Sequence, residues 1–277
     1  MEEDILKVNN LTKKFFVEKS FADKIKVIFD KGHAESITAL DNISFSVKKG
    51  EILGILGESG SGKSTLARIL MGIHKPDSGE AYLLDRDIFK ASGIERLSVL
   101  RDMQMVFQDP FGSLDPRMNV RQILKEPLKI HGITPSEDIE TFLINSLAEV
   151  GLSKEALDKY PSEFSGGQRQ RIGICRALIL NPKLIIADEA VSALDVSVQA
   201  QILELLVNLK QKRGLSLIFI SHDVAVVRQI SDRIILLYHG KIVEELPADK
   251  LLTDAKHEYT KKLLNAALSL REGASSH

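Results

Sequence analysis

The sequence predicts an α/β fold with a mainly parallel central sheet. Short apolar runs occur at residues 52–56, 104–107, 184–188 and 216–220, each as long as a buried strand. The first run leads through a glycine-rich turn into a helical pattern at residues 65–71, so strand, turn and helix follow one another directly. The chain has 277 residues, of which 44% are apolar and 27% charged, as in globular proteins, and this length allows one large domain or two smaller ones.

Further strands are predicted near both ends of the chain. Residues 5–10 and 42–48 alternate apolar and polar side chains, which indicates an antiparallel edge sheet. Near the C-terminus, residues 233–238 and 241–245 read as two short strands joined at Gly240 in a hairpin-like turn.

Residues 113–160 differ in character from the rest of the chain. Strand signals vanish there, and prolines at 116, 127 and 135 separate helical patterns such as residues 138–150. We therefore expect a helical insert between Gln108 and Ser165.

The glycine-rich turn fits the phosphate-binding pattern G-x-x-x-x-G-K-[ST] and is called the P-loop below. Glycines let successive backbone N–H groups point inward, and the helix dipole adds positive charge at the same place. Lys63 is expected to reach the outer phosphates, and the Ser64 hydroxyl to hold Mg²⁺. The alternative is a flexible turn with a surface lysine, but the flanking strand and helix favour a nucleotide site. Its residues are Gly57, Glu58, Ser59, Gly60, Ser61, Gly62, Lys63, Ser64 and Thr65.

Two adjacent carboxylates follow the apolar run at residues 184–187. Neighbouring side chains on a strand point to opposite faces, so Asp188 and Glu189 are expected to serve different purposes. We assign Asp188 to the metal ion and Glu189 to the attacking water as a general base. The alternative is that both acids are solvated side chains at the end of a strand. The motif alone is weak evidence for a catalytic site, but together with the P-loop it is strong evidence.

A second possible anion site begins at Ser165. Ser165 is a natural N-cap, and the amides of Gly166 and Gly167 open a long helical pattern at residues 168–180. A single nucleotide needs only one anion site from its own chain. The site at Ser165 would then bind a nucleotide held by another subunit. The alternative is that Ser165 begins an ordinary glycine loop before a helix.

These motifs together resemble those of ATP-binding cassette (ABC) ATPases. The run Ser165-Gly166-Gly167-Gln168 resembles the family's signature motif, and Ser192-Ala193-Leu194-Asp195 its D-loop. Gln108 matches the Q-loop glutamine, and His222 the switch histidine. The resemblance covers roughly residues 5–245. It implies a RecA-like P-loop NTPase core with an antiparallel β edge subdomain and an α-helical insert.

The resemblance also implies roles for individual residues. Two subunits would pack head to tail, each Mg²⁺–ATP being held by the P-loop of one and the signature motif of the other. Gln108 would touch both Mg²⁺ and the water, and His222 the γ-phosphate. Phe15 would stack on adenine, with Phe16 as the alternative. The residues expected to reach ATP in trans are Ser165, Gly166, Gly167, Gln168 and Asp195.

Three segments resemble the ATPases of oligopeptide and dipeptide importers. They are residues 107–118, residues 160–164 and the run His257-Glu258-Tyr259-Thr260. An insertion at residues 17–38 resembles that of the "F" component, which pairs with a "D" component. Nickel and glutathione importers share this subfamily, and an exporter ATPase is a more distant alternative.

The resemblance implies one domain over residues 1–277. Its core would span about 5–110 and 165–245, its helical subdomain about 111–164, and a C-terminal helical extension about 246–277. The implied partners are a second ABC ATPase subunit, identical or paralogous, two integral-membrane permease subunits and an extracytoplasmic substrate-binding protein. A docking groove for the permease is expected near residues 111–118.

The resemblance implies a peripheral protein at the cytoplasmic face of the membrane. The net charge of −1 gives no sign of nucleic-acid binding, and the acidic start at residues 1–4 is unlike a signal peptide. No apolar run approaches the ~20 residues of a membrane span. The single Cys175 excludes an intrachain disulfide. Two other classes of ABC protein do not fit the sequence. A DNA-maintenance ATPase would need a long coiled coil, for which the insert is too short, and a translation-associated ABC protein would need two cassettes, whereas there is one P-loop.

One position departs from the family. Ala190 stands where proline usually follows the catalytic glutamate. Alanine leaves the turn towards the D-loop freer, and we expect a modest effect on rate.

Overall fold

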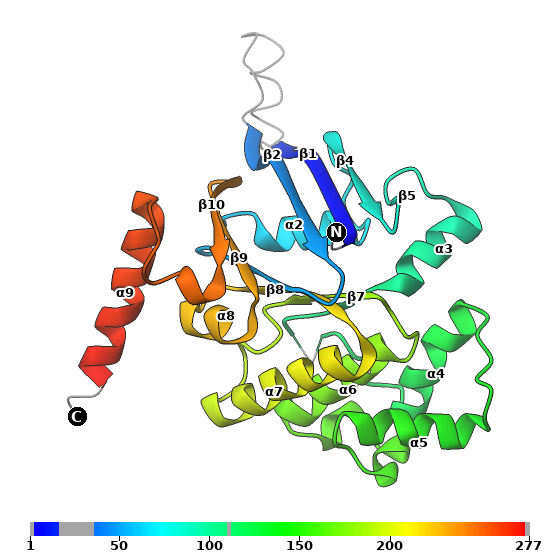
Figure 1. The fold of residues 1–277 in the computed structure, drawn as a ribbon. Helices are drawn as coiled ribbons and strands as arrows, with labels where there is room; N and C mark the ends of the chain where they lie inside the picture. The colour runs from blue at the N-terminus through cyan, green and yellow to red at the C-terminus, as the bar shows by residue number, and fades with distance from the viewer. Residues whose placement is uncertain (1–2, 17–35, 110–111, 275–277) are drawn as a thin grey trace, which may run out of the picture.

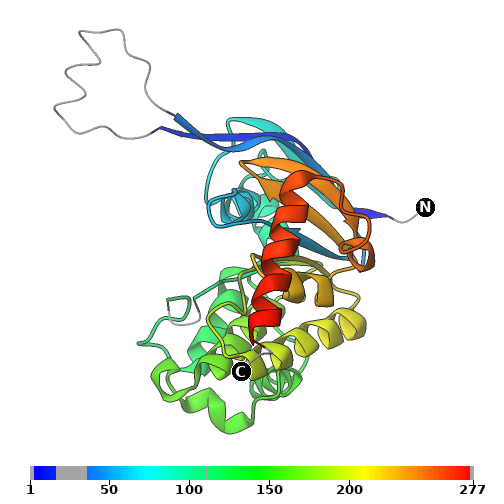
Figure 2. The same ribbon diagram turned by 90° about the vertical axis from the view of Figure 1, so that its left-hand side faces the viewer.

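The structure is a computed structural model that describes residues 3–16, 36–109 and 112–274 (Figures 1 and 2). The predicted insertion at residues 17–38 lies almost entirely outside the described residues, as do the first two residues and Phe111.

The central sheet has six strands in the order β10-β9-β3-β8-β7-β6. All neighbouring pairs are parallel except β9 with β10. The prediction of four parallel core strands is confirmed to within a residue at each end. It missed that the first arm of the C-terminal hairpin also pairs in parallel with β3. The strands are β3 (Ile52–Leu56), β6 (Met103–Val106), β7 (Leu184–Asp188), β8 (Ser216–Ser221), β9 (Arg233–Tyr238) and β10 (Lys241–Pro247).

An antiparallel sheet of order β2-β1-β4-β5 covers one side of the molecule. Its strands are β1 (Asp4–Phe16), β2 (Ser36–Lys48), β4 (Ser78–Leu83) and β5 (Arg86–Asp87). β1 and β2 are longer than predicted because their outer ends are largely exposed, so apolar alternation fades there although the strands continue. The register also shifts after Val8, where Asn10 has a left-handed φ of 51°. β4 and β5 were not predicted.

Helices cover both faces of the central sheet (Figure 1). α2 lies between the two sheets, whereas α4 to α7 gather on the opposite face, and α9 runs along the side of the molecule next to α8. The helices are α2 (Lys63–Leu70), α3 (Gly93–Asp102), α4 (Val120–Ile130), α5 (Ile139–Glu149), α6 (Gly166–Leu178), α7 (Val196–Arg213), α8 (Val224–Ile230) and α9 (Glu258–Ala274), with short 3-10 turns at Lys154–Asp158, Pro161–Glu163 and Ala248–Lys250.

The strands of the central sheet bury both faces, which explains why they are continuously apolar in the sequence. Along β3, Leu53 and Ile55 join a cluster with α2 and the antiparallel sheet. Ile52 and Leu56 belong to a second cluster, which runs without interruption into α4, α5 and α6 through residues such as Leu124. The helical segment and the sheet therefore share one apolar core.

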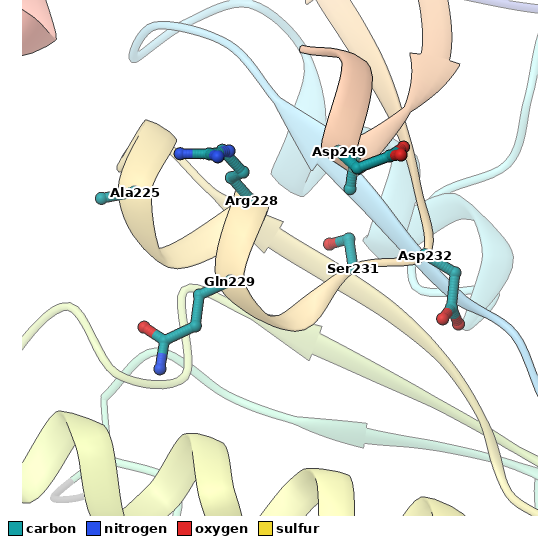
Figure 3. A pocket seen from close by; sticks show the side chains of 7 residues that line it. Ala225, Arg228, Gln229, Ser231, Asp232 and Asp249 are labelled. Atoms are coloured by element: carbon teal, nitrogen blue, oxygen red, sulfur yellow. The ribbon is translucent and has the colours of Figure 1, made fainter. Parts of the chain in front are cut away.

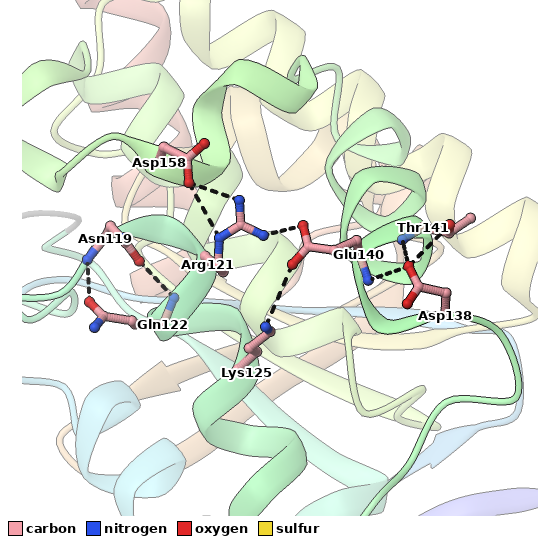
Figure 4. Close-up of polar contacts among 8 residues, drawn as sticks. All are labelled: Asn119, Arg121, Gln122, Lys125, Asp138, Glu140, Thr141 and Asp158. Carbon is pink, nitrogen blue, oxygen red and sulfur yellow. Dashed lines mark hydrogen bonds and ion pairs between the residues drawn. The ribbon is translucent and has the colours of Figure 1, made fainter.

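Within residues 112–183 the structure has helices and no strand, as predicted for the insert. Arg121 of α4 joins its parts: it donates to Glu140 of α5 and, at 2.8 Å, to Asp158 (Figure 4). Asn119 and Asp138 are the N-caps of α4 and α5, so both helices begin at side chains that accept from their first free amides.

Candidate functional site

The predicted site residues lie where parallel strands of the central sheet end. The P-loop follows β3, Gln108 follows β6, Asp188 ends β7 and His222 follows β8. The carboxyl ends of parallel strands form one edge, and ligands of open α/β sheets bind there.

The local shape of the P-loop requires its glycines. Gly60 and Gly62 have φ of 81° and 111°, the left-handed region that side chains rarely adopt. Gly57 lies so close to β9 that a Cβ would stand 2.3 Å from the carbonyl oxygen of Leu237. The chain then enters α2 at Lys63, which leaves the first amides of the helix without partners inside it.

Lys63 is held in place inside the loop. Its side chain is buried, with 4% of the residue exposed, and Nζ donates to the carbonyl oxygens of Gly57 at 2.7 Å and Glu58 at 2.8 Å. Burial lowers the pKa of Lys63, while the nearby carboxylates Glu189, Asp188 and Glu58 oppose that effect. A bound phosphate would further stabilise this buried ammonium charge.

Asp188 meets the P-loop helix directly. The Ser64 hydroxyl donates to Asp188 Oδ1 at 3.1 Å. Burial raises the pKa of Asp188, and the Ser64 hydrogen bond opposes the shift. A hydroxyl and a carboxylate oxygen are hard donors, and Mg²⁺ in nucleotide sites takes one or two such protein ligands and completes its shell with phosphate and water. The pair therefore fits a magnesium ion.

Glu189 turns to a different set of partners. Gln108 Nε2 donates to Glu189 Oε2 at 3.0 Å, and His222 Nδ1 lies 3.3 Å from Glu189 Oε1. The two carboxylates diverge as predicted, but the predicted cause is wrong, because β7 ends at Asp188 and Glu189 is no longer on the strand. Glu189 has a left-handed φ of 47°, and this turn of the backbone redirects its side chain.

Two cavities border these residues. One of about 720 Å³ is lined by Gln108, Asp188 and Arg68 together with Gly112 and Ser113. The other, of about 700 Å³, has Glu58, Ser59, Glu189 and His222 on one side and residues of α8 and α9 on the other. A third cavity, of about 560 Å³, lies between α8 and the Ala248–Lys250 turn, and none of the predicted site residues lines it (Figure 3).

The signature segment begins at Ser165, at the start of α6. Ser165 is the N-cap of α6 and forms a capping box with Gln168, as the N-cap prediction required. Gly167 faces α7, and a Cβ there would lie 2.4 Å from Val198 Cγ1. Asp195 is the N-cap of α7. The described linings of the two cavities that border Gln108, Asp188, Glu189 and His222 contain none of the signature residues or Asp195.

The two candidate aromatics lie at the end of β1. Phe15 packs edge-on against His74, with ring centroids 5.5 Å apart, and the Lys13 ammonium lies 5.4 Å from its ring. Phe16 is more exposed than Phe15, at 69% against 37%. No described contact joins either ring to the P-loop.

One P-loop contact was missed by sequence reasoning. The hydroxyl of Tyr259, in α9, accepts a hydrogen bond from the backbone N–H of Glu58 at 2.9 Å. Tyr259 was noted only as part of the subfamily-like run at residues 257–260. The two residues are 201 positions apart, and no pattern in a single sequence reports such a contact.

None of the helices in residues 3–16, 36–109 and 112–274 combines the length and apolar character needed to cross a bilayer.

Comparison with known proteins identifies the family. The family model described as "ABC transporter" matches residues 40–192. The chain is 46% identical over 275 residues to the oligopeptide transport ATP-binding protein AppF of Bacillus subtilis, covering 99% of this chain and 81% of that protein. It is 46% identical over 230 residues to the dipeptide transport ATP-binding protein DppF of Escherichia coli, covering 83% and 69%.

A solved relative shows the same fold with nucleotide products. It is the ATP-binding cassette MJ0796, a dimer in a post-hydrolysis state bound to ADP and Pi, with a TM-score of 0.74, 30% identity, and coverage of 88% of this chain and 98% of that one. The fold, the convergence of motif residues at the sheet edge and these similarities agree, and the chain therefore belongs to the ABC transporter family, as one of its ATP-hydrolysing subunits.

Proposed function

We propose that this chain is the ATPase subunit of an importer for oligopeptides or dipeptides. The observation that supports ATP hydrolysis at this site is that five side chains converge at one edge of the sheet: Lys63, Asp188, Glu189, Gln108 and His222. The cargo class is supported by relatives named for oligopeptide and dipeptide transport at 45–47% identity. A glutathione import relative is 43% identical, and the chain spans 41% of that longer protein.

Binding of ATP is assigned to the P-loop, with Phe15 stacking on adenine. The backbone amides of the loop that follow Gly60 surround the β-phosphate, Lys63 contacts the outer phosphates, and Ser64 and Thr65 close the site at the start of α2. Ser64, Asp188 and Gln108 would hold Mg²⁺, which when bound neutralises charge on the phosphate oxygens. The oxygen-donor pair Ser64 and Asp188 supports this assignment.

Hydrolysis is assigned to Glu189. Its carboxylate accepts a proton from the attacking water as the water approaches the γ-phosphate. Gln108 holds Oε2 and His222 lies beside Oε1, so both oxygens of the base have a neighbouring polar group. His222 is 55% exposed along its side chain, against 14% for Glu189, and it remains accessible to a γ-phosphate.

Two subunits complete each site. Ser165, Gly166, Gly167, Gln168 and Asp195 of one subunit face the ATP of its partner, which is identical or paralogous. Their absence from the described linings of the two cavities that border Gln108, Asp188, Glu189 and His222 of their own chain supports this arrangement. The remaining partners are two permease subunits and an extracytoplasmic binding protein, with this chain at the cytoplasmic face of the membrane. The cavity beside Gln108, Gly112 and Ser113 is assigned as the permease docking groove.

We treat the chain as one domain of core, helical subdomain and C-terminal extension. The apolar cluster that continues from β3 into α4, α5 and α6 supports this view.

Reconstitution tests the function. The chain is co-expressed with its membrane partners, purified as a complex and placed in vesicles with the binding protein. We expect ATP hydrolysis stimulated by peptide and uptake of labelled peptide, both lost in Glu189→Gln. Uptake of glutathione or Ni²⁺ without peptide uptake would contradict the assigned cargo.

Subunit complementation tests the shared site. Lys63→Ala and Ser165→Ala each disable both sites of a symmetric pair. A mixed pair has one site with neither change, so mixing the two inactive variants should restore activity. If each chain completed its own site, mixing would restore nothing. Where the partner is a paralogue, the same pairs of changes are divided between the two proteins.

A further inference from the structure

One peptide group of the P-loop has a partner on each side. Between Gly57 and Glu58, the carbonyl oxygen accepts from Lys63 Nζ at 2.7 Å, and the N–H donates to Tyr259 Oη at 2.9 Å. No cis peptide bond occurs in the described residues, so this C=O and N–H point in opposite directions. A partner that fixes the direction of the N–H therefore also fixes where the carbonyl points.

The phenol of Tyr259 is itself firmly held. Tyr259 is 7% exposed, and its ring stacks on Tyr238 with centroids 4.0 Å apart and planes 25° apart. Tyr238 is the last residue of β9, the strand that Gly57 approaches most closely. Burial and stacking on Tyr238 therefore restrict the position of the Tyr259 hydroxyl next to the loop.

The segment before Tyr259 is also anchored. Glu244 of β10 accepts from the backbone N–H of Lys256 at 2.6 Å, and the N–H of Tyr259 donates to His257 Nδ1 at 3.2 Å. These contacts tie the start of α9 to the central sheet, so the position of the phenol is set by the sheet.

The same C-terminal helix borders the reaction site. Leu263 and Ala267 of α9 line the cavity of about 700 Å³ whose other side carries Glu58, Glu189 and His222. The C-terminal helix is therefore part of the wall of a cavity that also holds the proposed general base Glu189.

We propose that Tyr259 is a positioning residue for the P-loop. It acts through the Gly57–Glu58 peptide and directs the Gly57 carbonyl at the Lys63 ammonium, so that the phosphates of ATP meet a lysine already in place. This inference rests on the proposed function, in which the P-loop binds the phosphates. Without the hydroxyl, the Glu58 N–H has lost its partner, the peptide can rotate, and ATP binding must order the loop.

The test is Tyr259→Phe in the full chain, which keeps the ring and its stack. We expect ATP affinity to fall and the KM for ATP to rise about tenfold, the effect of losing one part-buried hydrogen bond to the loop, with kcat changed less than about twofold. In the absence of nucleotide, amide hydrogen exchange of a peptide spanning residues 57–63 should become faster, while peptides from α9 keep their protection. An unchanged ATP affinity together with unchanged loop exchange would overturn the proposal. So would faster exchange throughout α9 with no change in KM, because the role would then be structural.

Two controls separate the possible failures. Tyr82→Phe removes a hydroxyl that donates to Glu80 on the antiparallel sheet, and it should leave KM unchanged. Lys63→Ala should abolish ATP binding; if it binds ATP normally, the P-loop assignment fails and this inference fails with it. If Lys63→Ala loses binding and Tyr259→Phe behaves as wild type, only the inference about Tyr259 fails.

If Tyr259→Phe does not fold, Glu244→Ala replaces it in the test. This change removes the contact that anchors the segment before Tyr259, so it should also raise the KM for ATP. An unchanged KM would then count against the proposal.

Discussion

Gln108 donates a hydrogen bond to Glu189 at 3.0 Å although 81 positions separate the two residues in the chain. The contact joins the end of β6 to the end of β7 across the edge of the sheet. Because the amide of Gln108 donates to one oxygen only, it fixes the direction in which the Glu189 carboxylate points. A carboxylate oriented in this way suits the role of general base proposed for Glu189.

Replacing Glu189 with Gln should stop turnover and leave ATP binding intact. The loss of a general base lowers a rate by about 10²–10⁴. The amide of glutamine keeps the size of the side chain but accepts no proton. Single-turnover hydrolysis and equilibrium ATP binding measure the two effects separately. Hydrolysis at the wild-type rate would refute the assignment of the base.

Gly167→Ala should destabilise the protein by overpacking. The new methyl group would lie 2.4 Å from Val198 Cγ1, and such overlaps cost about 1–3 kcal/mol. Gly166→Ala is the matched control, because its nearest neighbour would be Leu194 Cδ2 at an ordinary 3.5 Å. Thermal unfolding of both variants measures the difference.

The double variant Gly167→Ala/Val198→Ala separates packing from catalysis. Removing the valine methyl groups makes room for the alanine, so melting temperature should recover relative to Gly167→Ala. If ATPase activity stays low in this variant, Gly167 also serves the ATP of the partner. Equal destabilisation by Gly166→Ala and Gly167→Ala would contradict the packing argument.

Arg121→Met should lower the melting temperature in a pH-dependent way. The hydrogen bond from Arg121 holds the pKa of Glu140 below its usual value. The stability that a carboxylate gains from a lowered pKa is present above its unfolded pKa, about 4.3, and is lost as the pH falls through the folded value. The gap between wild type and variant should therefore be largest near pH 7 and shrink towards pH 3. Lys125→Met, which removes only a 3.6 Å contact to Glu140, should show a smaller gap. A gap independent of pH would exclude this explanation.

Cys175 should resist alkylation in the folded protein. Its thiol is 1% exposed and donates to the Ser146 carbonyl at 3.3 Å, and burial raises its pKa to about 12. The reactive thiolate is therefore scarce at pH 8. Mass spectrometry after iodoacetamide treatment should find Cys175 unmodified in the native state and modified in denaturant. Rapid native labelling would show that α6 opens readily.

Ala190→Pro should change ATPase activity by less than about tenfold, or 1.4 kcal/mol in barrier. Ala190 is buried just after the left-handed Glu189, where the chain turns towards the D-loop. Both carboxylates remain in the variant, so the chemistry is retained. Steady-state kcat measures the effect, and a larger change would show that the mobility of this turn controls the rate.

The sequence predicted the parts of the fold whose signal is local. β3, β7 and β8 are short apolar runs buried on both faces, and Gly60 and Gly62 of the P-loop occupy left-handed positions that few other residues accept. β4 and β5 escaped prediction because β5 has only two residues and the apolar alternation of β4 is confined to its last three, Ala81 to Leu83.

For the candidate site, the residue types and their order singled out Lys63, Asp188 and Glu189, whose roles stay predictions. The redirection of Glu189 was not predictable, because it follows from a backbone angle and not from strand alternation. Tyr259 was missed as a partner of the loop because its contact with Glu58 exists only once the C-terminal helix has folded back onto β9.

The uninterrupted apolar cluster beneath the central sheet has a mechanical consequence. Tightly packed protein interiors have low compressibility. A displacement at the carboxyl edge of the strands is therefore transmitted through the cluster to the helices that pack against it. The helices α4, α5 and α6 would then move with the sheet as one rigid body. A large-to-small change in the cluster, such as Leu124→Ala, would uncouple ATP hydrolysis from transport while the ATP site and the helical segment each stay intact.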